Sequence, residues 1–487
     1  MSTPALILAA LVPVLVALLA SRRRPKLPLP PGPPKLPIVG NLFDLPATFQ
    51  WETCARWCKE YNSDIIHLNV LGKSVIILGS FDATDALFEK RSAIYSDRNP
   101  EIWGGMADSP PSCKTSAQLK ASRKYEPHEQ LATHKLLKSL LRNPEAFSAH
   151  FGQMAGEISM SFTYGIDVLP SEDPFITLAQ RAVHAFAAAL VPGLYLVDTF
   201  PILKYIPTWF PGAGFKRKAR EWRKLTAFRT RVGKAELGIA PPSFTADALN
   251  ASNDATEPVF YQEHHIRDTA GTMYVASADT TVSSLRTFLL AMLANPDAQA
   301  KAQAEIDSVV GSEALPSFED RDLLPYVTAL VKEVLRWKNV TPLAVPRLLT
   351  VEDEYRGYRI PAGSAIIGNA WGLLHDETVY PDPHAFKPER FLLPNGQPDP
   401  AVRDPEVAFG FGRRQCPGRH MATSSIWITV ASLLATFDIK KAVDAEPTYE
   451  YTSSIVSEPL PFKCTITPRS AKAAALVQSV DTDSRKA

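Results

Sequence analysis

The segment FGFGRRQCPG, residues 409–418, holds one cysteine among glycines and arginines, directly ahead of a long apolar run. Such a thiol can bind a metal, attack a substrate or fill space. A structural zinc ion needs four converging ligands, and only His420 lies at a suitable spacing from Cys416, so zinc is disfavoured. A nucleophilic cysteine needs a histidine base that the fold brings to it, and the sequence leaves this alternative open.

A thiolate that serves as the axial ligand of haem iron accounts for every fixed position of this loop. Gly412 and Gly418 let the backbone turn closely around the sulfur of Cys416, so that N–H groups can point at it. The helix expected just beyond the cysteine places its positive end near the anion. Arg414 can bind a haem propionate through two hydrogen bonds, and Phe409 can cover the proximal face.

These five residues satisfy the signature F-x-x-G-x-R-x-C-x-G in full, and through it the chain resembles the cytochrome P-450 family of haem-thiolate monooxygenases. The resemblance implies a mainly α fold with a smaller β portion, and haem b (iron protoporphyrin IX) with Cys416 as the axial iron ligand. The implied reaction inserts one atom of O2 into an apolar organic substrate, by hydroxylation or epoxidation. NADPH would supply the electrons through a membrane-bound NADPH–cytochrome P-450 reductase, which Arg413 and Arg419 could help to dock, unless they are ordinary surface charges.

An E-x-x-R pair, Glu333 and Arg336, lies within KEVLR, and FKPERF follows downstream. By itself such a pair is most often a solvated surface pair. In the family that the chain resembles, the pair joins an arginine of a P-E-R-F element, which here is Arg390. The resemblance therefore implies a buried cluster of these three residues that fixes geometry near the haem.

The stretch YVASADTTVSSL, residues 274–285, holds an acid next to an alcohol, Asp279 and Thr280. The simplest role of Thr280 is a hydroxyl that bonds back to the carbonyl of Ala276. The pair also resembles the A-G-x-D-T-T pattern of the family, which implies that it helps to deliver protons to the oxygen site. Ser277 stands where glycine is usual, so its hydroxymethyl group either narrows the oxygen groove or supplies a further hydroxyl.

The chain departs from the family at the early W-x-x-x-R motif, because the two places fall on Gln130 and His134. His134 can still donate one hydrogen bond to a propionate, but a bidentate clamp is lost. The preceding residues 108–130 are polar and rich in Pro, Ser and Lys, unlike a helix approach. We hypothesise that a misread exon boundary produced this stretch, which sequencing of the transcript tests.

A second departure follows Pro346, where the usual His-Arg is replaced by Arg347 and Leu348. Arg347 is expected to take over a propionate. The resemblance also places four residues near the substrate, although all of them could be plain core residues. These candidates are Leu343, Ala344 and Val345, which follow the helix of the E-x-x-R pair, and Ala276 on the oxygen-side helix.

The elements that position these residues follow from periodicity. Residues 64–79 predict two strands around a turn at Gly72, and the run from Ile266 to Leu293 predicts a long helix. The chain after Pro346 is rich in strands and turns, and a last helix is expected over 421–437. The predicted domain spans residues 45–468, and residues 469–487 form a polar, mobile tail.

The N-terminus predicts a membrane anchor over residues 1–21, followed by a basic and proline-rich hinge over residues 22–44. Arginines directly after the apolar run favour an uncleaved anchor over a signal peptide, and a cytoplasmic catalytic domain. The expected location is the endoplasmic reticulum membrane, with a single pass through the lipid. A further apolar segment, residues 185–215, is either a buried helix pair or a loop that dips into the membrane.

The net charge of +1, from 52 Lys and Arg against 51 Asp and Glu, gives no support for a nucleic-acid partner. Residues 369–392 resemble the fungal microsomal branch of the family, many members of which act in secondary metabolism or xenobiotic oxidation. Two other functions stay open. One is a haem-thiolate isomerase or dehydratase that needs no reductase, and the other is a catalytically impaired membrane haem protein.

Overall fold

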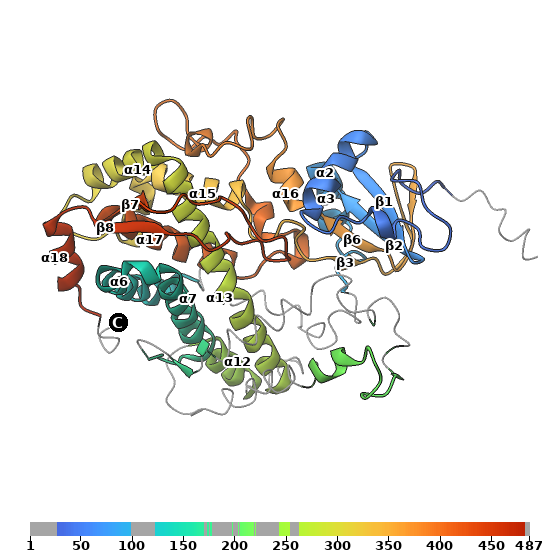
Figure 1. Cartoon of the computed structure of the whole chain (residues 1–487), viewed down its shortest axis with the longest axis horizontal. Coiled ribbons are helices and arrows are strands. Elements are labelled where there is room, and N and C mark those ends of the chain that lie inside the picture. The colour runs from blue at the N-terminus through green and yellow to red at the C-terminus, as the bar shows by residue number, and fades with distance from the viewer. Residues whose placement is uncertain are drawn as a thin grey trace, which may run out of the picture.

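The computed structural model describes residues 27–98, 122–169, 243–253 and 263–482, with short stretches between 173 and 220. Helices dominate one part of the described chain, and a small sheet with flanking helices forms the other (Figure 1). The mainly α fold with a smaller β portion is therefore confirmed, and it agrees with the predicted fold class.

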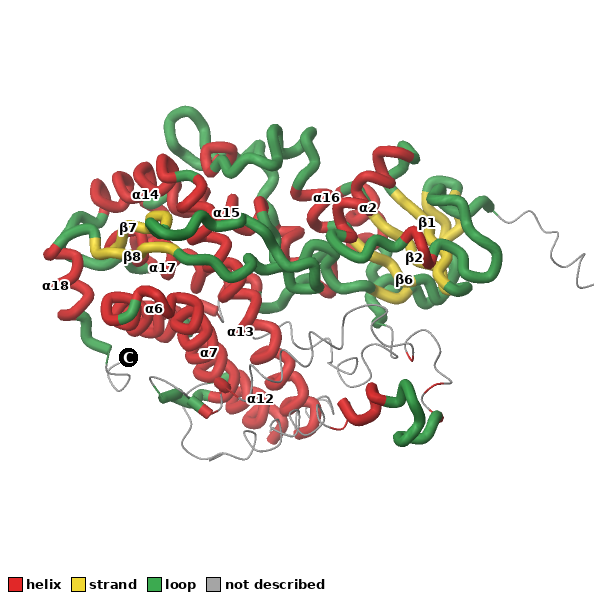
Figure 2. The backbone as a smooth tube through the Cα atoms, viewed as in Figure 1, coloured by secondary structure: helices red, strands yellow, loops and turns green. Residues whose placement is uncertain are grey.

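The helical part is built around α13, which crosses α7 and reaches α15 and α17 (Figure 2). The apolar residues of α17 surround the whole helix, so it is buried on all sides in the main core. The predicted long and last helices are both present. The helices of this part are α6 (Glu126–Arg142), α7 (Phe147–Tyr164), α12 (Phe244–Asn253), α13 (Glu263–Ala294), α14 (Pro296–Val309), α15 (Pro325–Trp337), α17 (Arg419–Thr436) and α18 (Ala471–Ser479).

The sheet has the strand order β1-β2-β6-β3. The predicted hairpin is confirmed, since β1 and β2 pair antiparallel and Gly72 has a φ of +86° in the turn. β2 pairs parallel with β6, which brings the strand-rich segment after Pro346 beside the N-terminal hairpin. The strands and their flanking helices are β1 (Ile65–Val70), β2 (Lys73–Leu78), β3 (Arg347–Leu348), β6 (Ala365–Gly368), α2 (Gln50–Glu60), α3 (Phe81–Thr84) and α16 (Ala370–Leu374).

Two antiparallel pairs complete the β portion, and several short helical turns carry the connections. The pairs are β4 (Asp353–Tyr355) with β5 (Tyr358–Ile360), and β7 (Phe437–Lys441) with β8 (Cys464–Pro468). The turns are η1 (Leu42–Asp44), η2 (Asp85–Lys90), η4 (Pro144–Ala146), η6 (Phe318–Leu323), η7 (Pro388–Phe391), η8 (Glu406–Phe409) and η9 (Gly412–Arg414).

The described part of the predicted hinge is attached to the β portion by backbone hydrogen bonds. The carbonyl of Pro31 accepts a hydrogen bond from His67 N–H at 2.9 Å, and that of Pro28 accepts one from Arg359 N–H at 2.8 Å. A Cβ on Gly32 would lie 2.3 Å from the carbonyl oxygen of His67, so only glycine allows this close approach. The predicted anchor, residues 1–21, lies outside the described residues. None of the helices in the described ranges combines the length and apolar character that crossing a bilayer demands.

The C-terminal residues differ from the predicted mobile tail. Ser470 caps α18 through a hydrogen bond from Ala473 N–H, and alanines favour the helix. Val477 is buried, and Lys138 of α6 donates to the carbonyl of Val480 at 2.6 Å. Helix propensity and one buried valine therefore hold residues 471–480 in place. Of the unusual stretch 108–130, residues 108–121 lie outside the described chain and the last five begin α6, so the exon hypothesis stays a prediction.

Candidate functional site

The loop that carries Cys416 lies between η9 and α17. Cys416 N–H donates to the carbonyl of Phe409 at 2.8 Å, which closes the loop. The backbone N–H of Gly418 donates to the Cys416 sulfur, and a Cβ on Gly418 would lie 3.9 Å from that sulfur. Helix α17 begins at Arg419, so its N-terminus follows the cysteine directly, as expected.

Gly412 is required by both its conformation and its neighbours. Its φ of +47° lies in the left-handed region, and a Cβ there would come within 2.1 Å of the Phe88 carbonyl oxygen. Its N–H donates to Glu89 Oε1 at 2.7 Å, which joins the cysteine loop to η2. The glycine of the signature thus allows close contact with η2, a neighbour that the sequence analysis did not identify.

Burial raises the pKa of the Cys416 thiol, while the N–H of Gly418 and the charge of Arg419 act in the opposite direction. A bound cation would stabilise the thiolate, so the sulfur is suited to ligate iron. Cys54 and Cys58 lie in the amphipathic helix α2, where Cys54 is buried and Cys58 is half-buried. Burial raises the pKa of both thiols to about 12, so they remain protonated, unlike the thiolate proposed for Cys416.

Three guanidinium groups, those of Arg98, Arg347 and Arg414, converge beside the loop. Burial, together with the charges of Arg98 and Arg414, lowers the pKa of Arg347 to about 9, whereas Glu89 opposes this effect. Burial and the charge of Arg414 likewise lower the pKa of Arg98 to about 10. Among the residues that the structure describes, one terminal nitrogen of Arg347, Nη1, is buried without a hydrogen-bond partner. A concentration of like charge with an unsatisfied buried donor calls for an anion.

The remaining contacts orient these arginines. Arg414 Nε donates to the carbonyl of Ser96 at 2.9 Å, and Arg347 Nη2 donates to the carbonyl of Phe411. Arg98 Nη1 donates to the carbonyls of Val345 and Pro346, both at 2.6 Å. The two carboxylates of haem b are anions of the kind that three guanidinium groups bind, so the residues present fit this cofactor. Sequence reasoning had named Arg347 and Arg414 but missed Arg98.

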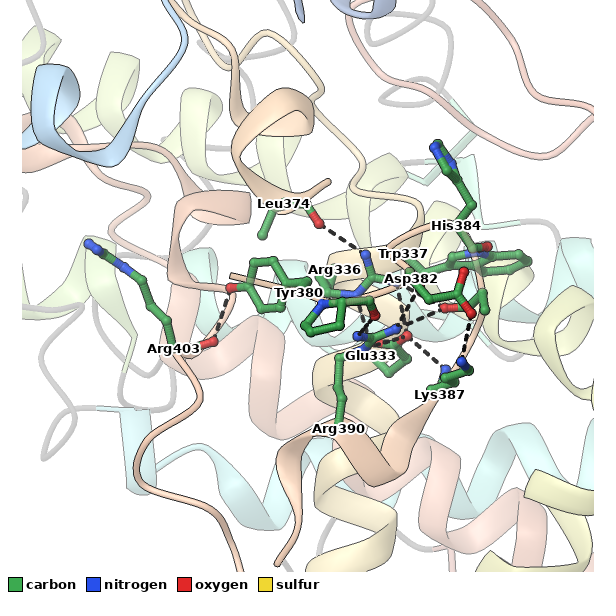
Figure 3. Close-up of polar contacts among 12 residues, drawn as sticks. Glu333, Arg336, Trp337, Leu374, Tyr380, Asp382, His384, Lys387, Arg390 and Arg403 are labelled. Atoms are coloured by element: carbon green, nitrogen blue, oxygen red, sulfur yellow. Dashed lines mark hydrogen bonds and ion pairs between the residues drawn. The ribbon is translucent and has the colours of Figure 1, made fainter. Parts of the chain in front are cut away.

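The predicted salt-bridge cluster is present, and its charged side chains are almost completely buried (Figure 3). Arg336 donates to Glu333 through Nε at 2.7 Å and through Nη2 at 2.9 Å, and Arg390 Nε lies 3.0–3.1 Å from both carboxylate oxygens. The backbone N–H of Lys387 donates to Glu333 as well, at 2.8 Å. The other guanidinium nitrogens bind backbone carbonyls, among them that of Leu374. The cluster therefore joins α15, the loop after α16 and η7.

The acid–alcohol pair lies in the middle of α13. Thr280 Oγ1 donates to the carbonyl of Ala276 at 2.8 Å, as expected for a hydroxyl within a helix. Ala276 is exposed although Ala278 is buried, and Asp279 and Thr280 are half-buried. Asp279 and Thr280 therefore lie near the middle of a helix that is packed against its neighbours but is exposed at Ala276.

The substrate candidates before β3 lie beside the arginine cluster, because Arg98 binds the Val345 carbonyl. Leu343 packs against the cluster of α2, β1 and β2, so its contacts are those of a core residue. Ala344 is half-buried, and its φ of +49° lies in the left-handed region, which residues other than glycine rarely adopt.

His134 lies half-buried on α6, the helix that packs against α17. Burial and the charge of Lys138 lower the pKa of its ring. Within the described part of the chain, its Nε2 is buried without a hydrogen-bond partner, so it makes no such bond to the three arginines. A neutral imidazole with an unsatisfied ring nitrogen can offer one hydrogen bond.

Comparisons with known proteins agree with this geometry. The model of the cytochrome P450 family matches residues 30–466. Cytochrome P450 monooxygenase 98 of Postia placenta is 43% identical, over 96% of this chain and 96% of its own. Cytochrome P450 monooxygenase ple1 of Rhodocybe pseudopiperita is 41% identical over 94% and 93%, respectively. Tryptamine 4-monooxygenase of Psilocybe cyanescens is 39% identical over 92% and 94%. The chain therefore belongs to the cytochrome P450 family and is a haem-thiolate monooxygenase, which uses haem b, O2 and electrons that a redox partner transfers from NAD(P)H to oxidise an organic substrate.

Proposed function

We propose that the protein hydroxylates or epoxidises an apolar organic substrate and receives its electrons from NADPH–cytochrome P-450 reductase. One observation carries the proposal: Asp279 and Thr280 occupy the centre of α13, next to the exposed Ala276. An acid and an alcohol at this place can pass protons, which the two-electron reduction of O2 requires. An isomerase or dehydratase that needs no reductase can dispense with such a pair, so its presence favours monooxygenation.

Each residue of the site has a distinct proposed role. Bound haem supplies the iron that activates dioxygen. Cys416 would ligate that iron, and the Gly418 N–H tunes the sulfur through its hydrogen bond. Phe409 covers the proximal side and fixes the loop through its carbonyl. The propionates would lie among Arg98, Arg347 and Arg414, with His134 as a further donor.

The protons would pass along α13. The Thr280 hydroxyl donates to the Ala276 carbonyl in this structure, and it must turn from there to donate to the oxygen site. Asp279 would replace the proton that Thr280 gives up. Glu333, Arg336 and Arg390 hold α15, the loop after α16 and η7 together and take no part in proton transfer.

Substitution of Thr280 by alanine is expected to separate NADPH consumption from product formation. Reduction would continue, but O2 would leave as hydrogen peroxide because the hydroxyl is missing, and the yield of product per NADPH would fall about 100-fold or more. The two amounts are measured side by side by absorbance and chromatography. Thr272→Ala is the matched control, because Thr272 makes the same back-bond, to Asp268 at 2.8 Å, two turns earlier. Unchanged coupling in Thr280→Ala would exclude the assigned role.

The two other functions have their own tests. A reductase-independent isomerase would convert its substrate without NADPH, and Thr280→Ala would leave its rate unchanged. An impaired haem protein would lack the strongly red-shifted absorption band that the reduced carbonyl adduct of a thiolate-ligated haem gives. The three arginines favour a protein that retains haem, even though the W-x-x-x-R motif is missing.

The substrate is proposed to be an apolar small molecule of fungal secondary metabolism or a xenobiotic. The similarity to fungal monooxygenases, one of which is named a tryptamine 4-monooxygenase, supports this class. Apolar ligands that shift the spin state of the purified protein would identify candidates.

With such a substrate, Ala344→Phe is expected to change the ratio of oxidised products about twofold or more, because a ring in place of the methyl group of a pocket residue changes how the substrate fits. Ala344 directly precedes Val345, whose carbonyl binds Arg98 of the arginine cluster. Identical product ratios would remove Ala344 from the pocket.

The proposed location is the endoplasmic reticulum membrane, with residues 1–21 as anchor and a cytoplasmic domain. Large apolar side chains on the described surface support contact with lipid: Ile38 is 94% exposed and Trp209 is 80% exposed. Trp209 lies in the apolar segment 185–215, so the described residues there favour surface contact over a buried helix pair. The exposed Arg413 and the half-buried Arg419 would help to dock the reductase on the proximal side.

A further inference from the structure

A hydrogen bond between two serines joins α7 to α13 at the level of the acid–alcohol pair. Ser159 Oγ and Ser277 Oγ lie 2.6 Å apart, and Ser159 is buried. Each hydroxyl also contacts its own helix. Ser159 lies 2.6 Å from the carbonyl oxygen of Ala155, and Ser277 lies 2.9 Å and 3.1 Å from those of Met273 and Tyr274.

The two hydroxyls carry only two protons for these contacts. An O···O distance of 2.6 Å requires one proton between the serines, since two lone pairs at that distance would repel. The same argument applies to Ser159 Oγ and the Ala155 carbonyl oxygen, which also lie 2.6 Å apart and of which only the hydroxyl can donate. Ser159 therefore donates to the Ala155 carbonyl, and Ser277 donates to Ser159.

Ser277 is placed to act on Thr280 through the backbone. The carbonyl that accepts the Thr280 hydroxyl belongs to Ala276, and it forms one rigid peptide unit with the N–H of Ser277. A side chain that is tied to α7 therefore restrains this peptide plane. A second back-bond, from Ser284 to the Thr280 carbonyl at 3.1 Å, continues along the helix.

We propose that Ser159 and Ser277 are positioning residues for Thr280: their hydrogen bond holds the Ala276–Ser277 peptide, so that the Thr280 hydroxyl starts from one fixed orientation on the Ala276 carbonyl before it turns to the oxygen site. The serine at the place where the family usually has glycine thus ties the proton-delivering segment to α7, and its hydroxyl is directed at α7. This inference rests on the proposed role of Thr280 in proton delivery.

The test compares Ser159→Ala, Ser277→Ala, the double variant and Ser277→Thr in the full-length holoenzyme. Each alanine variant is expected to lower the yield of product per NADPH by about three- to tenfold, the equivalent of one hydrogen bond. The double variant should be no worse than either single one, because all three lose the same bond. Ser277→Thr keeps a hydroxyl and should restore most of the yield.

A second readout does not depend on turnover. The infrared C–O stretch of the ferrous carbonyl adduct reports the polar groups at the oxygen site, so it should shift in both alanine variants and return towards the parent value in Ser277→Thr. Ser283→Ala is the matched control. Ser283 is a buried serine of α13, but its hydroxyl donates to the Ser457 carbonyl at 2.8 Å, away from α7. Its loss should lower the thermal stability and leave the yield and the C–O stretch unchanged.

The outcomes separate this inference from the proposed function. If Thr280→Ala uncouples the enzyme while both serine variants keep the parent yield and C–O stretch, the positioning role is wrong and the proposed function stands. Serine variants that lose only thermal stability would refute the positioning role in the same way. If Thr280→Ala itself leaves coupling intact, the proposed function fails first, and a shift of the C–O stretch in the serine variants would then show a structural link alone.

Discussion

Replacement of Cys416 by serine is expected to abolish the thiolate absorption band and the monooxygenase activity together. A serine hydroxyl does not ionise near neutral pH, so it cannot supply the anionic sulfur that directs electron density to the iron. The Gly418 N–H and the N-terminus of α17 would then face a neutral oxygen. The measurement is the absorption spectrum of the reduced carbonyl adduct, recorded with product formation on the same preparation.

Cys464→Ser is the control for this experiment, because Cys464 is a half-buried cysteine of β8 and burial raises its pKa to about 12. It should keep both the band and the activity. Survival of both properties in Cys416→Ser would refute haem–thiolate ligation through this residue. Loss of all bound haem would be distinguished by the pyridine haemochrome assay, since the arginines that we assign to the propionates are unchanged in the variant.

The largest effect on stability is expected from Glu333→Gln. The change leaves the guanidinium groups of Arg336 and Arg390 buried without their counter-charge and turns two acceptor oxygens into one acceptor and one donor. Removing one partner of a buried ion pair costs about 3–5 kcal/mol. Thermal unfolding followed by circular dichroism should show a midpoint several degrees lower, and the haem content after purification should fall.

Glu377→Gln is a matched control on the surface. Glu377 faces Lys59 at 3.7 Å, with 68% and 78% of the two side chains exposed. Exposed pairs contribute about 0–1 kcal/mol, so the midpoint should change little. Equal midpoints for the two variants would show that the buried cluster adds no more to stability than a solvated pair.

The signature loop depends on residues close to Cys416, so residue type and spacing were sufficient to identify it. The spacing of Glu333 and Arg336 places them on one helical turn, but their burial and their contact with Arg390, 57 residues away, were predicted only from the resemblance to the family. The sequence did not identify Arg98 as a site residue, because its partners, the carbonyls of Val345 and Pro346, lie 247 and 248 residues further along the chain. Nothing in the residues around Arg98 marks it as part of an arginine cluster.

Two further features of the structure also depend on contacts between residues that are far apart in the chain. The polar composition of the C-terminus predicted a mobile tail, but Val477 and the bond from Lys138 hold α18 against the body. The hydroxyl of Ser277 was predicted either to narrow the oxygen groove or to serve as an extra polar group. The structure shows this hydroxyl in contact with Ser159, a residue of α7 that only the packing of two helices brings to it.

The attachment of residues 27–44 to the sheet has a consequence for the orientation of the enzyme. The carbonyls of Pro28 and Pro31, which accept hydrogen bonds from the β portion, lie within a few residues of the start of the described chain. A membrane segment that precedes them would be joined to the folded domain by a very short linker. The folded domain would then have a restricted tilt relative to the membrane, with the end that carries the sheet towards the bilayer.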